Sequence, residues 1–137
     1  MMDIDLALAH FSQNHRSVLA TRRRDGRPQL SPVVHAVGND GRILISTRSG
    51  AIKARNIGRD PRVSICALSD AFFGKWAQVD GTATIIGLPE AMPLLRFYYS
   101  QISGEHPDWD EYERDMVSQG RVVIAVEPEA AGPDVAG

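Results

Sequence analysis

One segment of the sequence, residues Thr47 to Arg62, concentrates cationic side chains that could bind an anion. It reads T-R-S-G-A-I-K-A-R-N-I-G-R-D-P-R and carries five cations against a single acid, in a chain whose formal net charge is -2. A strand is expected over Arg42 to Thr47, and a short helix over Ser49 to Ile57. The first N–H groups of a helix are unpaired and carry positive partial charge, so they favour an anion. With Lys53 one turn into the helix and Arg48 beside its start, the segment predicts a site for a phosphorylated ligand.

Other candidate residues carry weaker signals. Pro32 interrupts an expected strand from Gln29 to Val37, and proline cannot donate to a sheet ladder, so this strand is predicted at an edge, at a bulge or where a ligand replaces a neighbour. Trp76 begins a long strand and could pack in the core or stack on a conjugated ring. His35 is expected to be structural, and the arginines at the hairpin tip Arg22 to Arg27 are expected to be solvated.

The sequence shows no recognisable pairing of a nucleophile with a base and no recognisable pair of catalytic carboxylates, so no catalytic residue is predicted. The acids between Glu105 and Glu113 are explained by helix capping rather than by a metal site. The single cysteine, Cys66, cannot form an internal disulfide; a buried, inert thiol is expected in a chain compatible with a reducing cytoplasm. No leader peptide and no apolar run of membrane-spanning length is expected, and the charge balance argues against nucleic-acid binding.

The elements that must position these residues are mostly short strands joined by tight turns, with helices inserted singly. This pattern predicts a mainly β, α+β fold built on a six-stranded antiparallel barrel, with one domain over residues 1–127 and a disordered tail over residues 128–137. The remaining expected elements are a helix over Asp3 to Ser12, strands over Ser17 to Thr21, Arg62 to Leu68, Lys75 to Ile86 with a bulge at Gly81, and Arg121 to Glu127, turns at Asp25-Gly26 and Asn39-Asp40-Gly41, and helices opening at Pro89 and Asp108.

Four motifs in this order resemble the pyridoxamine 5'-phosphate oxidase-like split β-barrel family, in particular its branch of F420-dependent (deazaflavin) reductases, the PPOX class. The motifs are L-A-T-R-R-R-D-G-R-P-Q-L-S-P-V at Leu19 to Val33, K-A-R-N-I-G-R-D-P-R at Lys53 to Arg62, W-A-Q-V-D-G-T-A at Trp76 to Ala83, and G-E-H-P-D-W-D-E-Y at Gly104 to Tyr112. The resemblance covers nearly the whole chain, from Ser12 to Val126.

The resemblance implies a homodimer with the cofactor in a groove between two barrels, and a redox enzyme whose cofactor supplies the chemistry. Phosphate would be held by Lys53, Arg55 and Asn56, helped by Thr47, Arg48 and Ser49; the ring would lie near Gln29, Ser31, Val33 and Trp76. The implied reaction is hydride transfer from reduced F420 to an unsaturated small molecule such as an enone, lactone or quinone-like ring. An FMN-dependent oxidoreductase and a non-enzymatic flavin- or deazaflavin-binding protein stay open as alternatives. The arginine-rich hairpin tip could attract the oligoglutamate tail of F420.

Overall fold

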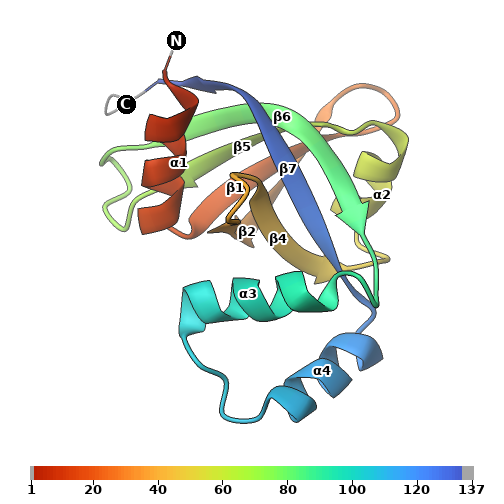
Figure 1. The fold of residues 1–137 in the computed structure, drawn as a ribbon. Coiled ribbons are helices and arrows are strands. Elements are labelled where there is room, and N and C mark those ends of the chain that lie inside the picture. Colours follow the sequence, from red (N-terminus) through yellow and green to blue (C-terminus); the bar gives the residue numbers. More distant parts are fainter. Residues whose placement is uncertain (1, 134–137) are drawn as a thin grey trace.

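The structure, a computed structural model, describes residues 2–133. Its seven strands form one curled antiparallel sheet in the order β2-β1-β5-β6-β7-β4-β3 (Figure 1). The predicted α+β, antiparallel split-barrel architecture is therefore confirmed. The elements are α1 (Ile4–Gln13), β1 (Arg16–Arg22), β2 (Pro28–Val34), β3 (Ala36–Val37), β4 (Ile43–Arg48), α2 (Ile52–Arg59), β5 (Arg62–Leu68), β6 (Ala77–Ile86), α3 (Met92–Ser103), α4 (Trp109–Ser118) and β7 (Arg121–Gly132).

A break at His35 explains why the sheet has seven strands where six were expected. The predicted strand from Gln29 to Val37 divides into β2 and β3, which lie at opposite edges of the sheet, so the edge position expected from its proline is confirmed. The His35 ring is fully buried at this break. Its Nε2 donates to the carbonyl of Phe11 at 2.9 Å, which leaves Nδ1 to accept from the hydroxyl of Ser17 at 2.8 Å. His35 thus ties α1, β1 and the break together, in agreement with the structural role predicted for it.

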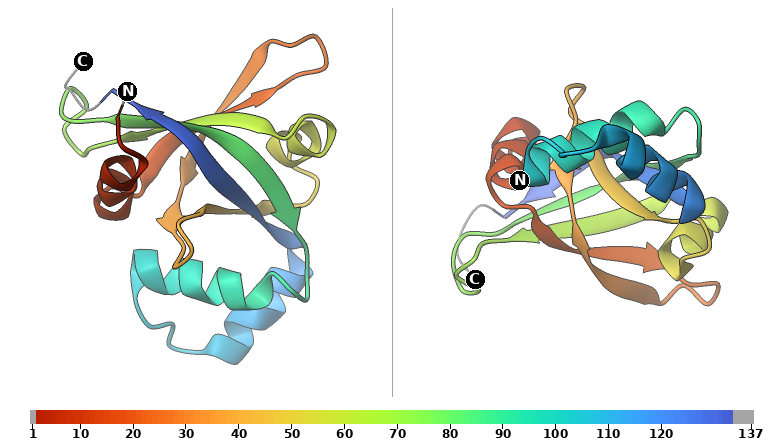
Figure 2. Two further views of the ribbon diagram at one scale, coloured as in Figure 1. Left: turned by 45° about the horizontal axis from the view of Figure 1, so that its top comes forward. Right: turned by 90° about the horizontal axis from the view of Figure 1, so that it is seen from below.

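Two helices close the opposite ends of the curled sheet. Alternation along β1 and β5 turns Leu19 and Ile65 inward, where both are fully buried. Phe11 from α1 joins this core at one end of the barrel, and Ile57 from α2 joins it at the other. Figure 2 shows α1 and α2 on either side of the sheet. The strands between them therefore set the distance between the two ends.

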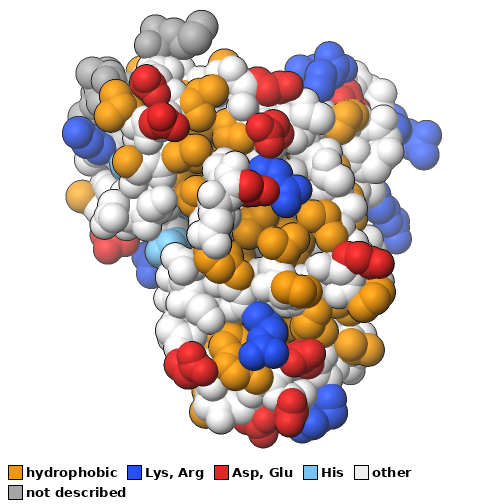
Figure 3. Space-filling view, viewed as in Figure 1, with side chains coloured by type: hydrophobic (Ala, Val, Ile, Leu, Met, Phe, Trp, Pro, Cys, Tyr) orange, Lys and Arg blue, Asp and Glu red, His pale blue; other side chains and the backbone are white. Residues whose placement is uncertain are grey.

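Helices α3 and α4 cover the outer face of β4 and β7 instead of entering the barrel. Leu95 of α3 and Tyr112 of α4 pack against Leu44 and Val123 of the sheet. Hydrophobic side chains accordingly gather between the sheet and these helices in the space-filling view (Figure 3). Within residues 2–133, no helix is long and apolar enough to cross a membrane.

Several predicted boundaries are confirmed and others are wrong. Both hairpin turns are present, and β6 pairs with β7 through a register shift between Asp80 and Gly81, as expected for a bulge. The expected disorder of residues 128–132 is wrong, because β7 continues to Gly132 and pairs with Gln78 of β6. Residues 134–137 of the predicted tail lie outside the described residues. Helix α2 starts three residues later than predicted, and Pro89 lies in a turn before α3.

Candidate functional site

The junction between β4 and α2, at one end of the barrel, holds the segment that the sequence predicted to bind an anion. The backbone N–H of Ser49 donates to the carbonyl of Gly120 at 2.9 Å, and that of Ala51 donates to the carbonyl of Arg48 at 3.0 Å, so the loop before α2 is held by backbone contacts. Ala51 is the N-cap residue and has no side chain that can cap the helix, and the first turn contains no acid. The first N–H groups of α2 therefore lack a side-chain acceptor, which suits them to an anionic ligand.

Cationic side chains surround this junction. Lys53 lies half-buried in the first turn of α2, whereas Arg48 and Arg55 are exposed. Arg48 also faces Arg121 across the β4–β7 ladder. Like charges directly opposite each other in neighbouring strands repel, and an anion between them would relieve that repulsion. Thr47, the last inward-facing residue of β4, is buried next to Arg48 in the chain, on the barrel side of the strand. Basic side chains gather at this end of the molecule in Figure 3.

A chain of hydrogen bonds connects α2 to the edge strand β2. Arg59 donates to Asn56 Oδ1 at 2.9 Å, and Asn56 Nδ2 donates to Thr21 Oγ1 at 3.1 Å. Thr21 Oγ1 donates to Gln29 Oε1 at 3.2 Å, and Gln29 Nε2 donates to Ser31 Oγ at 2.9 Å. This chain brings together Asn56, Gln29 and Ser31, three residues of the predicted site. Asn56 is buried, and both the oxygen and the nitrogen of its side-chain amide are already hydrogen-bonded within the protein. Asn56 therefore aligns α2 with β2 and does not reach a phosphate.

Thr21 and Arg121 belong to this region but were not singled out from the sequence. Thr21 follows Ser17 and Leu19 on the inward face of β1, and a buried hydroxyl at such a position needs a partner. That signal could have pointed to a polar contact across the barrel. Arg121 could not have been found in the same way, because its pairing with Arg48 depends on the register of β4 and β7.

Two other arginines near α2 have structural partners. Arg59 also donates to the backbone carbonyl of Arg22 at 2.8 Å. Arg62 contacts Asp60 through two nitrogens at 3.0 and 2.8 Å. The hydrogen bonds from Arg62 lower the pKa of Asp60 to about 2, so this pair stays ionised at neutral pH. A hollow of about 570 Å³ lies beside these residues, on the outer face of β1, β5 and β6.

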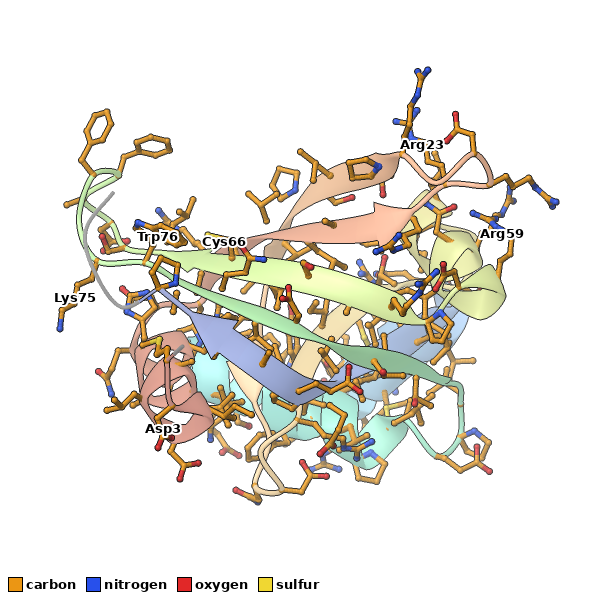
Figure 4. The ribbon with its side chains drawn as sticks, turned by 90° about the horizontal axis from the view of Figure 1, so that it is seen from above. Asp3, Arg23, Arg59, Cys66, Lys75 and Trp76 are labelled. Carbon is orange, nitrogen blue, oxygen red and sulfur yellow. The ribbon has the colours of Figure 1, made fainter. Side chains whose placement is uncertain are left out.

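Trp76 and Val33 do not join the cluster at α2. Trp76 lies at the opposite end of the barrel, where it lines a hollow of about 300 Å³ together with Lys75 and His10 of α1. Figure 4 shows Trp76 and Lys75 at one end of the sheet and Arg59 at the other. Val33 is half-buried against the barrel core. A single chain therefore holds most of the predicted site residues near α2 and β2 and keeps the predicted ring-stacking tryptophan apart.

The motif from Gly104 to Tyr112 builds an aromatic cluster between α3 and α4. The Tyr99 ring centroid lies 4.9 Å from that of His106 and 5.8 Å from that of Trp109. Burial raises the pKa of Tyr112 to about 12, and its hydroxyl donates to the carbonyl of Leu95 at 2.8 Å. These contacts join the two helices and give the motif a packing role.

Of the acids in this motif, Asp108 acts in capping, as predicted, whereas Glu105 accepts from the indole N–H of Trp109 at 3.0 Å. The side chain of Asp108 accepts from the backbone N–H of Glu111 at 3.1 Å, at the start of α4. Cys66 differs from the prediction, because β5 turns it to the outer face of the sheet, where it is only partly buried. Burial raises the pKa of this thiol and so favours its protonated form.

Comparison with known proteins places this architecture in one family. The family model described as pyridoxamine 5'-phosphate oxidase matches residues 5–132. The chain belongs to this family. The result confirms the resemblance that the four sequence motifs indicated, and it covers the whole of the candidate site.

Solved structures agree with this family assignment. The conserved hypothetical protein Rv2991 from Mycobacterium tuberculosis superposes with a TM-score of 0.78 at 25% identity, over 96% of this chain and 83% of that protein. A structure named F420 reductase gives a TM-score of 0.67 at 23% identity, over 90% of this chain and 94% of that one. The heme storage protein HutZ from Vibrio cholerae gives 0.70 at 20% identity, over 99% and 98%. These similarities show a fold that hosts proteins of different function.

Proposed function

We propose that the protein is an F420-dependent reductase of the pyridoxamine 5'-phosphate oxidase family that acts on an unsaturated small molecule in the cytoplasm. The observation that carries this proposal is the uncapped start of α2, which has cations on both sides and is tied by hydrogen bonds to β2. Such a start supplies backbone donors and charge to a phosphate. Since a hydrogen-bonded chain links α2 to β2, the phosphate and the ring of one ligand would be held in a defined relation.

The residues present fit a phosphorylated, tricyclic redox cofactor. Lys53, Arg48 and the hydroxyl of Ser49 would hold its phosphate, with Arg55 adding charge from the exposed side of α2. Gln29 and Ser31, whose side chains bond to each other, would border the ring on β2. When bound, the reduced deazaflavin supplies a hydride to the electron-poor carbon of an enone, lactone or quinone-like ring, and a proton from solvent completes the addition. The protein's part is to bind and orient, and none of its side chains is assigned to proton transfer.

We also propose a homodimer with the cofactor in a groove between the two protomers. The outer face of β2 supports it, because Leu30 is 61% exposed and Val34 is 41% exposed on that face. Apolar side chains gathered on an edge strand favour burial against another surface. Sedimentation of the purified protein tests this point, and a monomer at micromolar concentration would contradict it.

Fluorescence titration with F420 and with FMN in parallel tests the cofactor assignment. Replacement of Lys53 by Ala should raise the dissociation constant for F420 about tenfold or more, because one charge-assisted contact to phosphate is lost. Arg114→Ala, which removes a cation from the exposed side of α4, is the matched control and should leave the constant unchanged. An unchanged constant in Lys53→Ala would refute the phosphate assignment, and a clear preference for FMN would reverse the cofactor.

Two alternatives remain open at the same site. An FMN-dependent oxidoreductase on this barrel would use the same phosphate and ring contacts. The residues assigned to the site, all within the described part of the chain, include no acid–base pair. This favours a non-enzymatic binding protein as the second alternative. Anaerobic turnover with reduced F420 and a panel of enones divides these possibilities, since a binder would show affinity without turnover.

A further inference from the structure

The curled sheet has a split between β2 and β4, which approach each other without sharing a ladder. Each of these strands pairs on its other side, β2 with β1 and β4 with β7. The short strand β3 pairs with β4 only as far as Leu44, so residues 45–48 have no neighbouring strand on that side in the described part of the chain. The backbone groups along both edges of the split therefore need partners other than a strand.

One hydrogen bond shows which backbone groups of β2 face the split. The N–H of His35 donates to the carbonyl of His15 at 2.9 Å, so the backbone of His35 faces β1. This direction alternates along an antiparallel strand, so Val34, Pro32 and Leu30 turn their backbone groups to the split. A proline at such a position removes no N–H from the ladder with β1, which explains why Pro32 does not disrupt the pairing. The carbonyl of Val34 is the last acceptor on this edge before the break at His35.

The facing edge of β4 presents the backbone of Ser46. The N–H of Gly38 donates to the carbonyl of Arg42 at 2.8 Å, on the side of β4 that carries β3. By the same alternation, Leu44 and Ser46 turn their backbone groups to this side, and Ser46 lies beyond the last pair with β3. Ser46 precedes Arg48 of the candidate anion-binding segment by two residues, about 7 Å along the strand. The edge of β4 thus leads from the split to that segment.

Tyr98 of α3 reaches across the split with its phenol group. The hydroxyl donates to the carbonyl of Val34 at 2.9 Å. Burial raises the pKa of Tyr98, although the backbone N–H of Ser46 and the charge of Arg121 lower it in part. An N–H group has this effect only when it points to the phenol oxygen at short range. The oxygen of Tyr98 therefore lies between the edge of β2 at Val34 and the edge of β4 at Ser46.

The helix that carries Tyr98 is fixed on the sheet. In Figure 1, α3 lies beside β4, and Leu95 of this helix packs against Leu44 of that strand. The carbonyl of Leu95 also accepts from the hydroxyl of Tyr112 at 2.8 Å, which ties α3 to α4. The neighbouring Tyr99 turns its ring into the aromatic cluster between these two helices. Of the two adjacent tyrosines, Tyr98 therefore serves the split and Tyr99 serves the packing of the helices.

We propose that Tyr98 is a positioning residue for the cofactor ring. The hydrogen-bonded chain from Asn56 holds β2 near α2, and Tyr98 holds the same strand at its other end. Gln29 and Ser31, whose side chains bond to each other on β2, are thereby kept in a fixed relation to the start of α2. The inference rests on the proposed function for the places of the phosphate and the ring. It differs from a packing role, because it predicts weaker ring binding without weaker phosphate binding.

Amide hydrogen exchange tests the contact across the split without any cofactor. Tyr98→Phe removes the hydroxyl and keeps the ring, and Tyr99→Phe is the matched control one residue away. The amide of Ser46 should exchange about tenfold faster in Tyr98→Phe and at the wild-type rate in Tyr99→Phe. Equal protection of Ser46 in all three proteins would overturn the inference. If Tyr98→Phe does not fold, a Ser46 amide that exchanges in the wild-type protein as fast as that of Leu30, on the open edge of β2, would overturn it.

Two ligands test the positioning role itself. F420 reports on phosphate and ring together, whereas inorganic phosphate reports on the candidate anion-binding segment alone, through the amide resonances of Ser49 and Ala51. Tyr98→Phe should raise the dissociation constant for F420 about tenfold and leave that for phosphate unchanged, and Tyr99→Phe should change neither. Equal weakening of both ligands would show that Tyr98 supports the site as a whole and would overturn the inference. An unchanged F420 constant in Tyr98→Phe would overturn it as well.

A failure of the proposed function gives a different result. A wild-type protein that binds phosphate but neither F420 nor FMN refutes the cofactor assignment, and with it the ring that Tyr98 would position. In that case the exchange of Ser46 still shows whether Tyr98 joins β2 to β4. A wild-type protein that binds F420 with an affinity that Tyr98→Phe does not alter refutes this inference alone and leaves the proposed function standing.

Discussion

The buried imidazole of His35 should make the stability of this protein depend on pH between about 4 and 6.5. Burial lowers the pKa of His35 from its usual 6.5 to about 4, although the carbonyl of Phe11 raises it in part and the neighbouring His15 lowers it further. In the unfolded chain, His35 takes up a proton near pH 6.5, whereas in the folded protein it stays neutral. The unfolded state therefore binds more protons in this range, and the free energy of unfolding falls as the pH falls.

The magnitude follows from the two pKa values of His35. The gap between 6.5 and about 4 corresponds to about 3.4 kcal/mol when the pH has fallen below both values. About 2 kcal/mol of this loss should occur between pH 7 and pH 5. Domains of this size are stable by about 5–15 kcal/mol, so the loss should be measurable as a lower urea midpoint. Urea denaturation at pH 7, 6 and 5 gives the free energy directly.

A His35→Gln variant separates this residue from the other titrating groups. It should be less stable at pH 7, because the contacts to Phe11 and Ser17 change, and it should lose about 2 kcal/mol less than wild type between pH 7 and 5. His106→Gln, in the partly buried loop before α4 and outside the groups that act on His35, is the control and should retain the slope that His35 causes. If His35→Gln does not fold, the ring resonances of His35 in the wild-type protein should stay constant from pH 7 to 5. A slope that survives in His35→Gln, or a ring that titrates near 6.5, would refute the reasoning.

Three further predictions concern packing, the hydrogen-bonded chain and capping. Gly81→Ala should lower the free energy of unfolding by about 1–3 kcal/mol or more, because the added Cβ would meet the carbonyl of Glu127 and Val126 Cγ1. Gly87→Ala is the control and should change that free energy little, because the Cβ would enter open space. Urea denaturation of both variants measures the difference. Asn56→Ala should cost about 1–3 kcal/mol, because the buried Thr21 Oγ1 loses its donor and Arg59 loses one of its two acceptors, and it should weaken F420 binding only through the position of α2. Stability equal to wild type would remove Asn56 from that role. Asp108→Ala should cost about 1 kcal/mol through loss of the N-cap of α4, measured by thermal or urea unfolding, and an unchanged midpoint would show that the cap contributes nothing.

Local chemistry in the sequence was enough to predict most of the fold. The turns at Asp25-Gly26 and Asn39-Asp40-Gly41, the strand from Arg62 to Leu68 and the bulge at Gly81 all follow from residues close in sequence. The basic segment was recognised for the same reason, since the strand end, the helix start and the cations are contiguous. The similarity to the pyridoxamine 5'-phosphate oxidase family was visible because its motifs are also contiguous.

Only the tertiary structure decided which distant residues meet. The division of one predicted strand at His35 depends on hydrogen-bond partners from α1 and β1. The extension of β7 through Pro128 depends on pairing with β6, and the local alternation of apolar and polar residues does not predict this pairing. The contact of Asn56 with Thr21, the opposition of Arg48 and Arg121, and the separation of Trp76 from α2 likewise arise from sheet order and register. Short-range residue preferences therefore determined the elements and the candidate anion-binding segment, whereas burial and strand pairing between remote segments determined which residues surround that segment.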